Sequence, residues 1–112
     1  MRIVQIAQRA EDLDRAEAFY TALLGHGATA RFDPPGLLFF DLDGVRLLLE
    51  RGASSALVYL QVSNVHEALE RVDAEVVTPP HVIFRHEDDR LGPAGMDEWQ
   101  AFIRDSEGNT VG

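Results

Sequence analysis

DLDRAEAFYTALLG, residues 12–25, is the stretch that decides the fold. Its apolar side chains recur at spacings of three and four, which places them on one face of a helix: Leu13, Ala16, Phe19, Tyr20, Leu23 and Leu24. Asp12 is suited to cap the first turn, and Gly25 to end the helix with a left-handed backbone. The charged residues fall mostly off the apolar stripe, so this helix is expected to lie on an apolar surface.

A second, weaker copy of the pattern follows at residues 64–72, NVHEALERV. Asn64 takes the place of Asp12, and Asn64 with Glu67 has the spacing of a capping box. The strand-like stretch ALVYLQV precedes this copy, as IVQIA precedes the first copy. A repeat of this size indicates a duplicated supersecondary unit.

The rest of the chain fits strands around these two helices. The first half is expected to contain strands at 2–9, 28–33, 37–42 and 45–50, separated by Pro-Pro-Gly and Asp-Gly turns. The second half is expected to contain strands at 56–62, 75–77, 81–85 and 98–104, with prolines interrupting the second of them and a loop at 87–95. A last strand starts at Thr110 and is cut short at Gly112, so a tail or a neighbouring chain is expected to complete the sheet.

Length, charge and composition exclude several classes of function. A length of 112 residues suits a single domain, with both halves sharing one core. The net charge of −9, without a cluster of basic residues, argues against binding to nucleic acid. The absence of cysteine excludes disulfides and thiolate sites. No apolar run is long enough for a signal peptide or a membrane span, so we expect a cytoplasmic protein that does not contact a membrane.

Taken together, these features resemble the vicinal oxygen chelate superfamily, which includes glyoxalase I, bleomycin-resistance proteins and extradiol dioxygenases. The most specific matches are DLDRAEAFYTALLG and the turn DSEGN at 105–109, which is similar to the family's DPDGN. The resemblance implies an α+β fold of two βαβββ modules, residues 1–52 and 53–112, forming a curled mixed sheet around an open cavity. Family members often dimerise, so the resemblance also implies a homodimer.

The resemblance also locates the four metal ligands of the family's enzymes. The first corresponds to Gln5 and the second to Glu50, and both carry oxygen donors. The third corresponds to Leu57 and the fourth to Gly112, which offer no donor. Because a divalent catalytic site as a rule needs at least three protein ligands, we expect no stoichiometric metal. The simpler interpretation of Gln5 and Glu50 is a hydrogen bond within the sheet and a solvated strand end.

The cavity face is expected to carry apolar groups and a few polar ones, as small-ligand sites do. The residues predicted to bind ligand are Gln5, Phe39 (or its neighbour Phe40), Leu48, Leu57, His81 and Trp99. His81 and His86 are also candidates for replacement metal ligands or an acid–base pair, although one inward-facing and one solvated histidine is the simpler interpretation.

Two functions remain open at this point. The first is a metal-free protein that binds a small, largely apolar or aromatic molecule, similar to the bleomycin-resistance branch. The second is a lyase, isomerase or dioxygenase that uses a divalent metal such as Zn, Mn or Fe through an altered ligand set. Leu57 and Gly112 favour the first function, whereas Gln5 with Glu50 keeps the second open.

Overall fold

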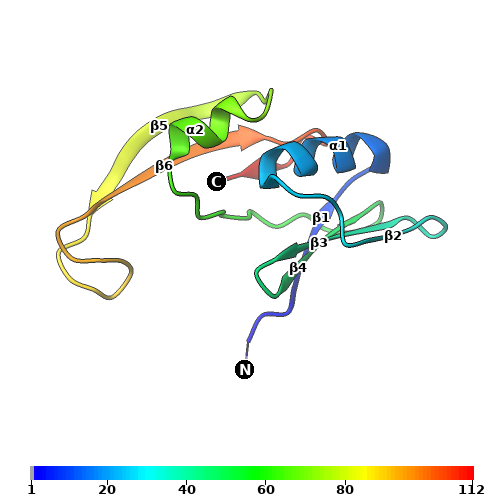
Figure 1. The fold of residues 1–112 in the computed structure, drawn as a ribbon, viewed down its shortest axis with the longest axis horizontal. Coiled ribbons are helices and arrows are strands. Elements are labelled where there is room, and N and C mark those ends of the chain that lie inside the picture. The colour runs from blue at the N-terminus through cyan, green and yellow to red at the C-terminus, as the bar shows by residue number, and fades with distance from the viewer. Residues whose placement is uncertain (1) are drawn as a thin grey trace.

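The computed structural model describes residues 2–112, so Met1 of the first predicted module lies outside it. The elements follow the order β1 (Gln5–Arg9), α1 (Leu13–Leu24), β2 (Ala30–Phe32), β3 (Leu37–Leu42), β4 (Val45–Glu50), α2 (Val65–Glu70), β5 (Val76–Arg85), β6 (Asp97–Arg104) and β7 (Thr110–Val111) (Figure 1). The fold is α+β, as predicted. None of the described helices is long and apolar enough to cross a membrane.

The signals at both ends of α1 act as the sequence predicts. The backbone of Asp12 is extended, and its Oδ1 accepts a hydrogen bond from the Arg15 amide at 3.0 Å. Gly25 has a φ of 78°, which glycine adopts at little cost, and its amide donates to the Thr21 carbonyl. The buried residues between these ends confirm the apolar stripe, with Leu23 rather than Leu24 as its last buried member: Leu13, Ala16, Tyr20 and Leu23.

The first half of the chain forms a four-stranded sheet in the order β1-β4-β3-β2. The neighbouring strands β1 and β4 are parallel, with Gln5 opposite Arg46 and Arg9 opposite Glu50. The other neighbouring strands are antiparallel. This is the βαβββ arrangement that the sequence predicts.

The second half forms a three-stranded sheet in the order β5-β6-β7. The strand predicted at 56–62 is reduced to one parallel bridge between Val58 and Val111, with hydrogen bonds between Gly112 and residues 58 and 60. Its reduction has a physical reason, because β7 offers a partner of only two residues. This segment lies beside β7 as β1 lies beside β4, so the second half repeats the order of the first.

Strand β5 corrects one prediction. The sequence predicts that Pro79 and Pro80 interrupt a strand, yet β5 runs through both prolines. The two prolines are tolerated because β5 is at the edge of its sheet, where a missing amide donor costs little. The irregularity appears instead as register shifts between β5 and β6.

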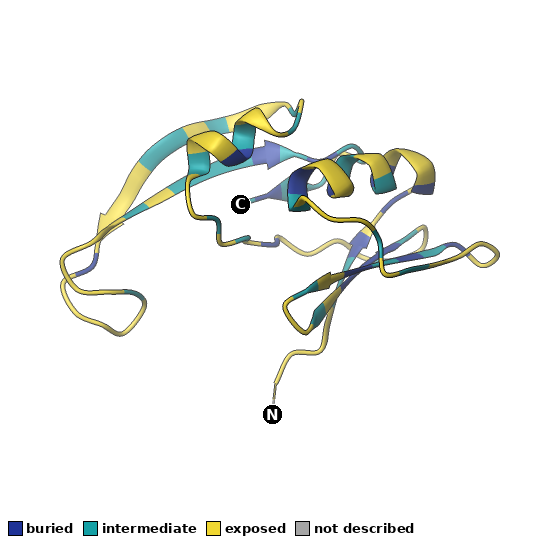
Figure 2. Ribbon diagram, in the orientation of Figure 1, coloured by how far each residue is buried: buried dark blue, intermediate teal, exposed yellow. Residues whose placement is uncertain are grey.

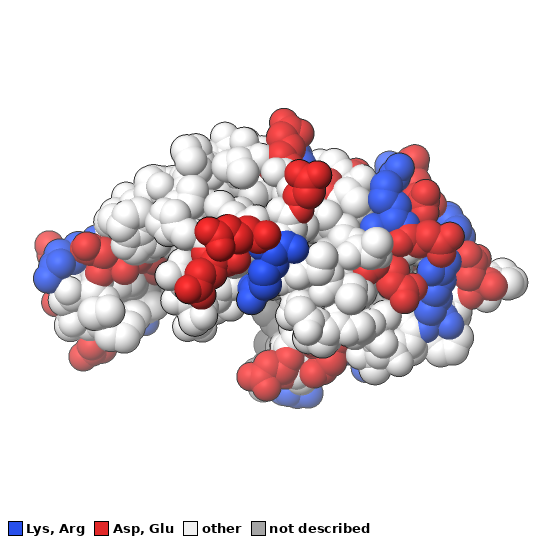
Figure 3. All heavy atoms as spheres, turned by 45° about the horizontal axis from the view of Figure 1, so that its top comes forward, with Lys and Arg blue, Asp and Glu red and all other residues white. Residues whose placement is uncertain are grey.

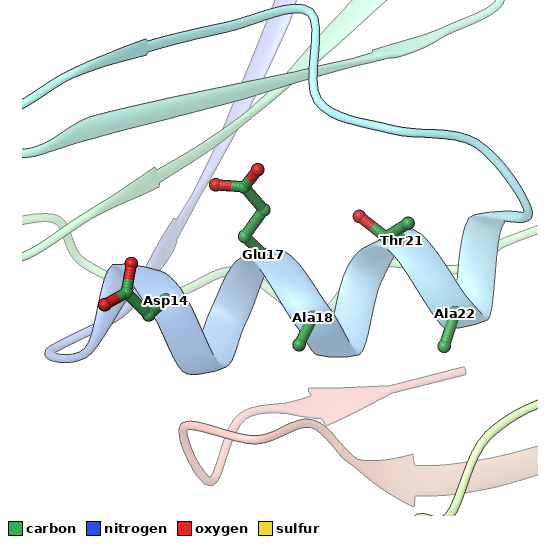
Figure 4. A pocket seen from close by; sticks show the side chains of 5 residues that line it. All are labelled: Asp14, Glu17, Ala18, Thr21 and Ala22. Atoms are coloured by element: carbon green, nitrogen blue, oxygen red, sulfur yellow. The ribbon is translucent and has the colours of Figure 1, made fainter.

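Helix α1 lies in the core that both sheets share. One buried cluster joins its apolar stripe to Leu38, Phe40, Leu47 and Leu49 of the first sheet and to Ile103 and Val111 of the second. Figure 2 shows the buried residues along the inner side of α1 and on the strands next to it, and Figure 4 shows strands of both sheets on either side of the helix. We call the side of each sheet that faces a helix its helix face and the opposite side its open face.

A polar joint also connects the two halves at the turn 105–109. The Asp105 carboxylate is buried and accepts hydrogen bonds from the Tyr20 hydroxyl at 2.7 Å, from the Asn109 side chain, and from the backbone amides of Glu107 and Asn109. Burial together with this carboxylate raises the pKa of Tyr20. The first helix is therefore tied to the last turn through a satisfied buried network.

Glu107 of the same turn lies at the N-terminus of α1. Its Oε1 accepts hydrogen bonds from the backbone amides of Glu11 and Asp12 at 2.9 Å each, and its Oε2 pairs with the Arg15 Nε at 2.6 Å. Burial raises the pKa of this carboxyl, but the donors of Arg15, Asp12, Ser106 and Glu11 together outweigh burial and hold its pKa at about 2. The negative charge of the Glu107 carboxylate also complements the positive end of the α1 dipole.

The molecule is extended for its length. Its radius of gyration is 14.9 Å, whereas a compact chain of this length is expected to have one of about 13 Å. The β5–β6 hairpin accounts for much of the extension, because it reaches away from α1 beyond the end of α2 (Figure 1). Several large apolar side chains of β5 are between 38% and 46% exposed: Val76, Val77, Val82, Ile83 and Phe84.

Candidate functional site

The open face of the first sheet carries three rows of side chains, set by the strand register. The first row is Gln5, Arg46 and Asp41, the second is Ala7, Leu48 and Phe39, and the third is Arg9, Glu50 and Leu37. Within the first row, Arg46 Nε donates a hydrogen bond to Gln5 Oε1 at 2.9 Å. A polar row therefore borders an apolar one.

The apolar row contains two of the predicted ligand-binding residues. Leu48 is 6% exposed although it lies on the open face, and Phe39 is half-buried beside it. Phe32 of β2 adds a second ring, 6.2 Å from the Phe39 ring in an edge-to-face arrangement and 53% exposed. Phe40, the other predicted phenylalanine, is fully buried in the core on the helix face. Gln5, Leu48 and Phe39 thus share one face, as predicted.

The second sheet presents a separate open face. Leu57 is 50% exposed, and Tyr59 next to it packs edge-to-face on Phe102, with the ring centres 5.8 Å apart. His81 pairs with Gln100 across β5 and β6, and its Nδ1 lies 3.0 Å from the Pro79 carbonyl oxygen. Leu57 and His81 are therefore on a different sheet from Gln5, Phe39 and Leu48.

The remaining two candidates lie elsewhere. Trp99 pairs with Val82 and contacts His66 of α2, so the structure places it on the helix face and not with His81. His86 is buried beneath Gly92, and its Nε2 lies 3.1 Å from Glu98 Oε1. Regular alternation along β6 puts Trp99 on the same face as Ile103, whose side chain lies in the shared core.

The four positions at which the resemblance implies metal ligands lie on different segments: Gln5 on β1, Glu50 at the end of β4, Leu57 before α2 and Gly112 after β7. Gln5 and Glu50 are in the first and third rows, four residues apart along neighbouring strands, which separates them by about 13 Å. A Cβ atom added to Gly112 would lie 2.8 Å from Tyr59 and 2.9 Å from Phe102, so these rings fill the space of a fourth ligand. Residues 2–112 contain no group of three or more His, Asp or Glu placed to hold a metal.

Two groups of residues on the open faces are missing from the sequence prediction. Arg46 alternates with Leu48 and Glu50, so the pattern places it on the predicted face, but its hydrogen bond to Gln5 depends on the β1–β4 register. The Tyr59–Phe102 pair joins a coil segment to β6, and nothing in the local sequence indicates that contact.

Two hollows on the surface of residues 2–112 lie away from the predicted ligand residues. One follows the outer side of α1 and is bounded by Asp14, Glu17, Ala18, Thr21 and Ala22 (Figure 4). Both acids of this hollow pair with Arg31. The other surrounds Arg15 and Glu107, which pair with each other. In each hollow, the charged side chains are already paired within the protein.

Comparisons with known proteins identify solved structures that share this fold. No family model and no curated protein sequence matches the chain. Solved structures match over nearly its whole length. A lactoylglutathione lyase from Agrobacterium tumefaciens is 25% identical, with a TM-score of 0.61, covering 98% of this chain and 90% of that one. A glyoxalase-related enzyme from Fulvimarina pelagi is 16% identical, with a TM-score of 0.70 and coverages of 99% and 85%. A glyoxalase/bleomycin resistance protein/dioxygenase from Alicyclobacillus acidocaldarius is 15% identical, with a TM-score of 0.68 and coverages of 98% and 87%.

Proposed function

We propose that this chain, which has the fold of the glyoxalase, bleomycin-resistance and dioxygenase proteins, binds a small, largely apolar or aromatic molecule on its open sheet faces and holds no metal. The observation that carries the proposal is the composition of the open face of the first sheet. Leu48, Phe39 and Phe32 form an apolar surface there, with Gln5 and Arg46 at one side of it. Small-ligand sites typically combine such a surface with a few placed polar groups.

The donor positions support the metal-free form of this function. Gln5 is hydrogen-bonded to a permanently charged guanidinium, which repels a metal cation. Glu50 lies about 13 Å away along the strands. The alternative is a metal-dependent lyase, isomerase or dioxygenase. Such an enzyme requires a set of metal ligands that the arrangement of residues 2–112 does not bring together.

We expect the purified protein to bind N-phenyl-1-naphthylamine, a neutral aromatic fluorophore, and to contain well below one metal per chain. The probe's fluorescence should rise on binding, and Phe32→Ser should weaken binding about tenfold, because a large exposed ring contributes about 1.5 kcal/mol of contact. Leu91→Ser is the matched control, because Leu91 is an exposed apolar residue outside both open faces.

The measurements are a fluorescence titration and elemental analysis after incubation with Zn²⁺, Mn²⁺ or Fe²⁺. About one metal per chain, lost on Gln5→Ala or Glu50→Ala, would overturn the metal-free function and favour the enzyme. Absence of probe binding would contradict the ligand-binding function itself.

We also propose a homodimer in which a second copy covers part of the open faces and the β5–β6 hairpin. The support is the extended shape and the exposed apolar residues of β5, where residues 76–84 carry no charge. Figure 3 shows an uncharged surface at the upper left, over this region, whereas acidic and basic side chains lie at both ends and across the middle of the view. Exposed apolar surface of this extent is typical of protein interfaces.

Light scattering at micromolar concentration should give the mass of a dimer. Ile83→Asp should shift the species towards the monomer mass, because it places a charge in the apolar surface of β5, whereas Ala18→Glu on the exposed side of α1 should leave the dimer intact. A monomer mass for the unsubstituted protein would rule out the dimer.

A further inference from the structure

Arg46 has no acidic partner among residues 2–112, in contrast to Arg31 of β2 and Arg51 just after β4. Arg31 pairs with Asp14 and Glu17, and Arg51 pairs with Asp33. Arg46 forms no ion pair with any of residues 2–112, and its hydrogen bond to Gln5 uses only its Nε. Its terminal N–H groups therefore remain available on the open face.

The nearest acid in the row is engaged elsewhere. Asp41 lies opposite Arg46, but its Oδ1 accepts the Gly44 amide at 3.1 Å and so stabilises the β3–β4 turn. The Gln5 amide oxygen meanwhile fixes the guanidinium at its Nε, which leaves the other edge as a fork with two parallel donors. A guanidinium fork of this kind matches the paired oxygens of a carboxylate or a similar oxyanion.

We infer that Arg46 selects an aromatic monoanion as the ligand, with its oxyanion on the guanidinium and its ring system over Leu48, Phe39 and Phe32. This inference rests on the proposed ligand-binding function and adds the charge of the ligand. The apolar row lies two residues along the strands from Arg46, about 7 Å, which is the distance from the acidic group to the far ring in a molecule of one or two fused rings.

The surroundings of Arg46 favour a ligand with one negative charge over a ligand with two. Glu50 is in the row beyond the apolar one, so a second anionic group at the far end of the ligand would meet a carboxylate. The net charge of −9 also repels polyanions at long range. The single positive charge of Arg46 is matched by a monoanion on both grounds.

The test compares two probes with one skeleton. N-phenyl-1-naphthylamine is neutral, and 8-anilinonaphthalene-1-sulfonate adds one oxyanion to it. The protein should bind the sulfonate about tenfold more tightly, as a charge-assisted hydrogen-bonded pair implies. Arg46→Gln should remove that preference and leave the affinity for the neutral probe within about twofold. Asp41→Asn, which keeps the acceptor for Gly44 but removes the competing charge, should strengthen sulfonate binding.

Arg71→Gln is the control for net charge, because Arg71 is exposed at the end of α2 and also lacks an acidic partner among residues 2–112. Equal affinity for the two probes, or an equal loss of sulfonate binding in Arg71→Gln and Arg46→Gln, would overturn the inference while leaving the proposed function in place. Failure of both probes to bind would instead overturn the proposed function. Arg46→Lys, which keeps the charge without the fork, should retain only part of the preference if the fork is responsible.

Discussion

Asp105→Ala is expected to lower the free energy of unfolding by about 4 kcal/mol, because it leaves several buried donors without an acceptor. The carboxylate accepts hydrogen bonds from the Tyr20 hydroxyl, the Asn109 side chain and two backbone amides, and the residue is 6% exposed. Urea denaturation followed by circular dichroism would measure the change.

Two further variants separate the contributions to this network. Tyr20→Phe removes one hydrogen bond and keeps the ring in the core, so it should cost only about 1 kcal/mol. Asp73→Ala, at an exposed aspartate, should change stability by less than about 0.5 kcal/mol. A loss in Asp105→Ala as small as that of Tyr20→Phe would show that solvent replaces the missing carboxylate.

Glu107 is expected to make stability fall as the solution becomes acidic. Its pKa is about 2 in the folded protein and about 4.3 in an unfolded chain. A carboxyl group whose pKa is lower when folded stabilises the fold above its unfolded pKa, and this contribution is lost as the pH falls through the folded value. The contribution is about 3 kcal/mol at neutral pH and disappears between about pH 5 and about pH 2.

Glu107→Gln is therefore expected to destabilise the protein by about 2 kcal/mol at neutral pH and to flatten the dependence of stability on pH below about pH 5. Denaturation curves at several pH values for both proteins would measure the difference. Glu11→Gln is the control, because Glu11 also precedes α1 but is exposed and pairs only with the exposed Arg9. Parallel pH profiles for the Glu107→Gln variant and the original chain would contradict the assigned role.

The sequence predicts those parts of the fold that depend on local pattern. Helix α1, its cap and the β3–β4 hairpin follow from apolar spacing and from turn residues within a few positions. The shared face of Gln5, Leu48 and Phe39 follows from simple alternation along regular strands. These features need no information about distant partners.

The features that the sequence misplaces depend on long-range pairing. The strand predicted at 56–62 has the correct composition but a partner of two residues, so it forms one bridge. Trp99 is on the helix face because it shares a face of β6 with Ile103, and only the packing of Ile103 against α1 shows that this face is the covered one. The separation of Gln5 from Glu50, and the contact of Gln5 with Arg46, are set by a parallel register that neither strand encodes alone.

The polar joint has a consequence for the order in which the chain folds. The Tyr20–Asp105 and Asn109–Arg9 hydrogen bonds connect residues 85 and 100 positions apart, and Glu107 meets the start of α1 across a similar distance. Closing such large loops is slow, because their entropy must be lost before the contacts form. During synthesis, α1 therefore leaves the ribosome with its Asp12 cap but without the contacts of Glu107, and with its apolar side not yet covered by Ile103 and Val111. Because the first half lacks these contacts until the second is made, we expect the two halves to unfold in one cooperative transition rather than module by module.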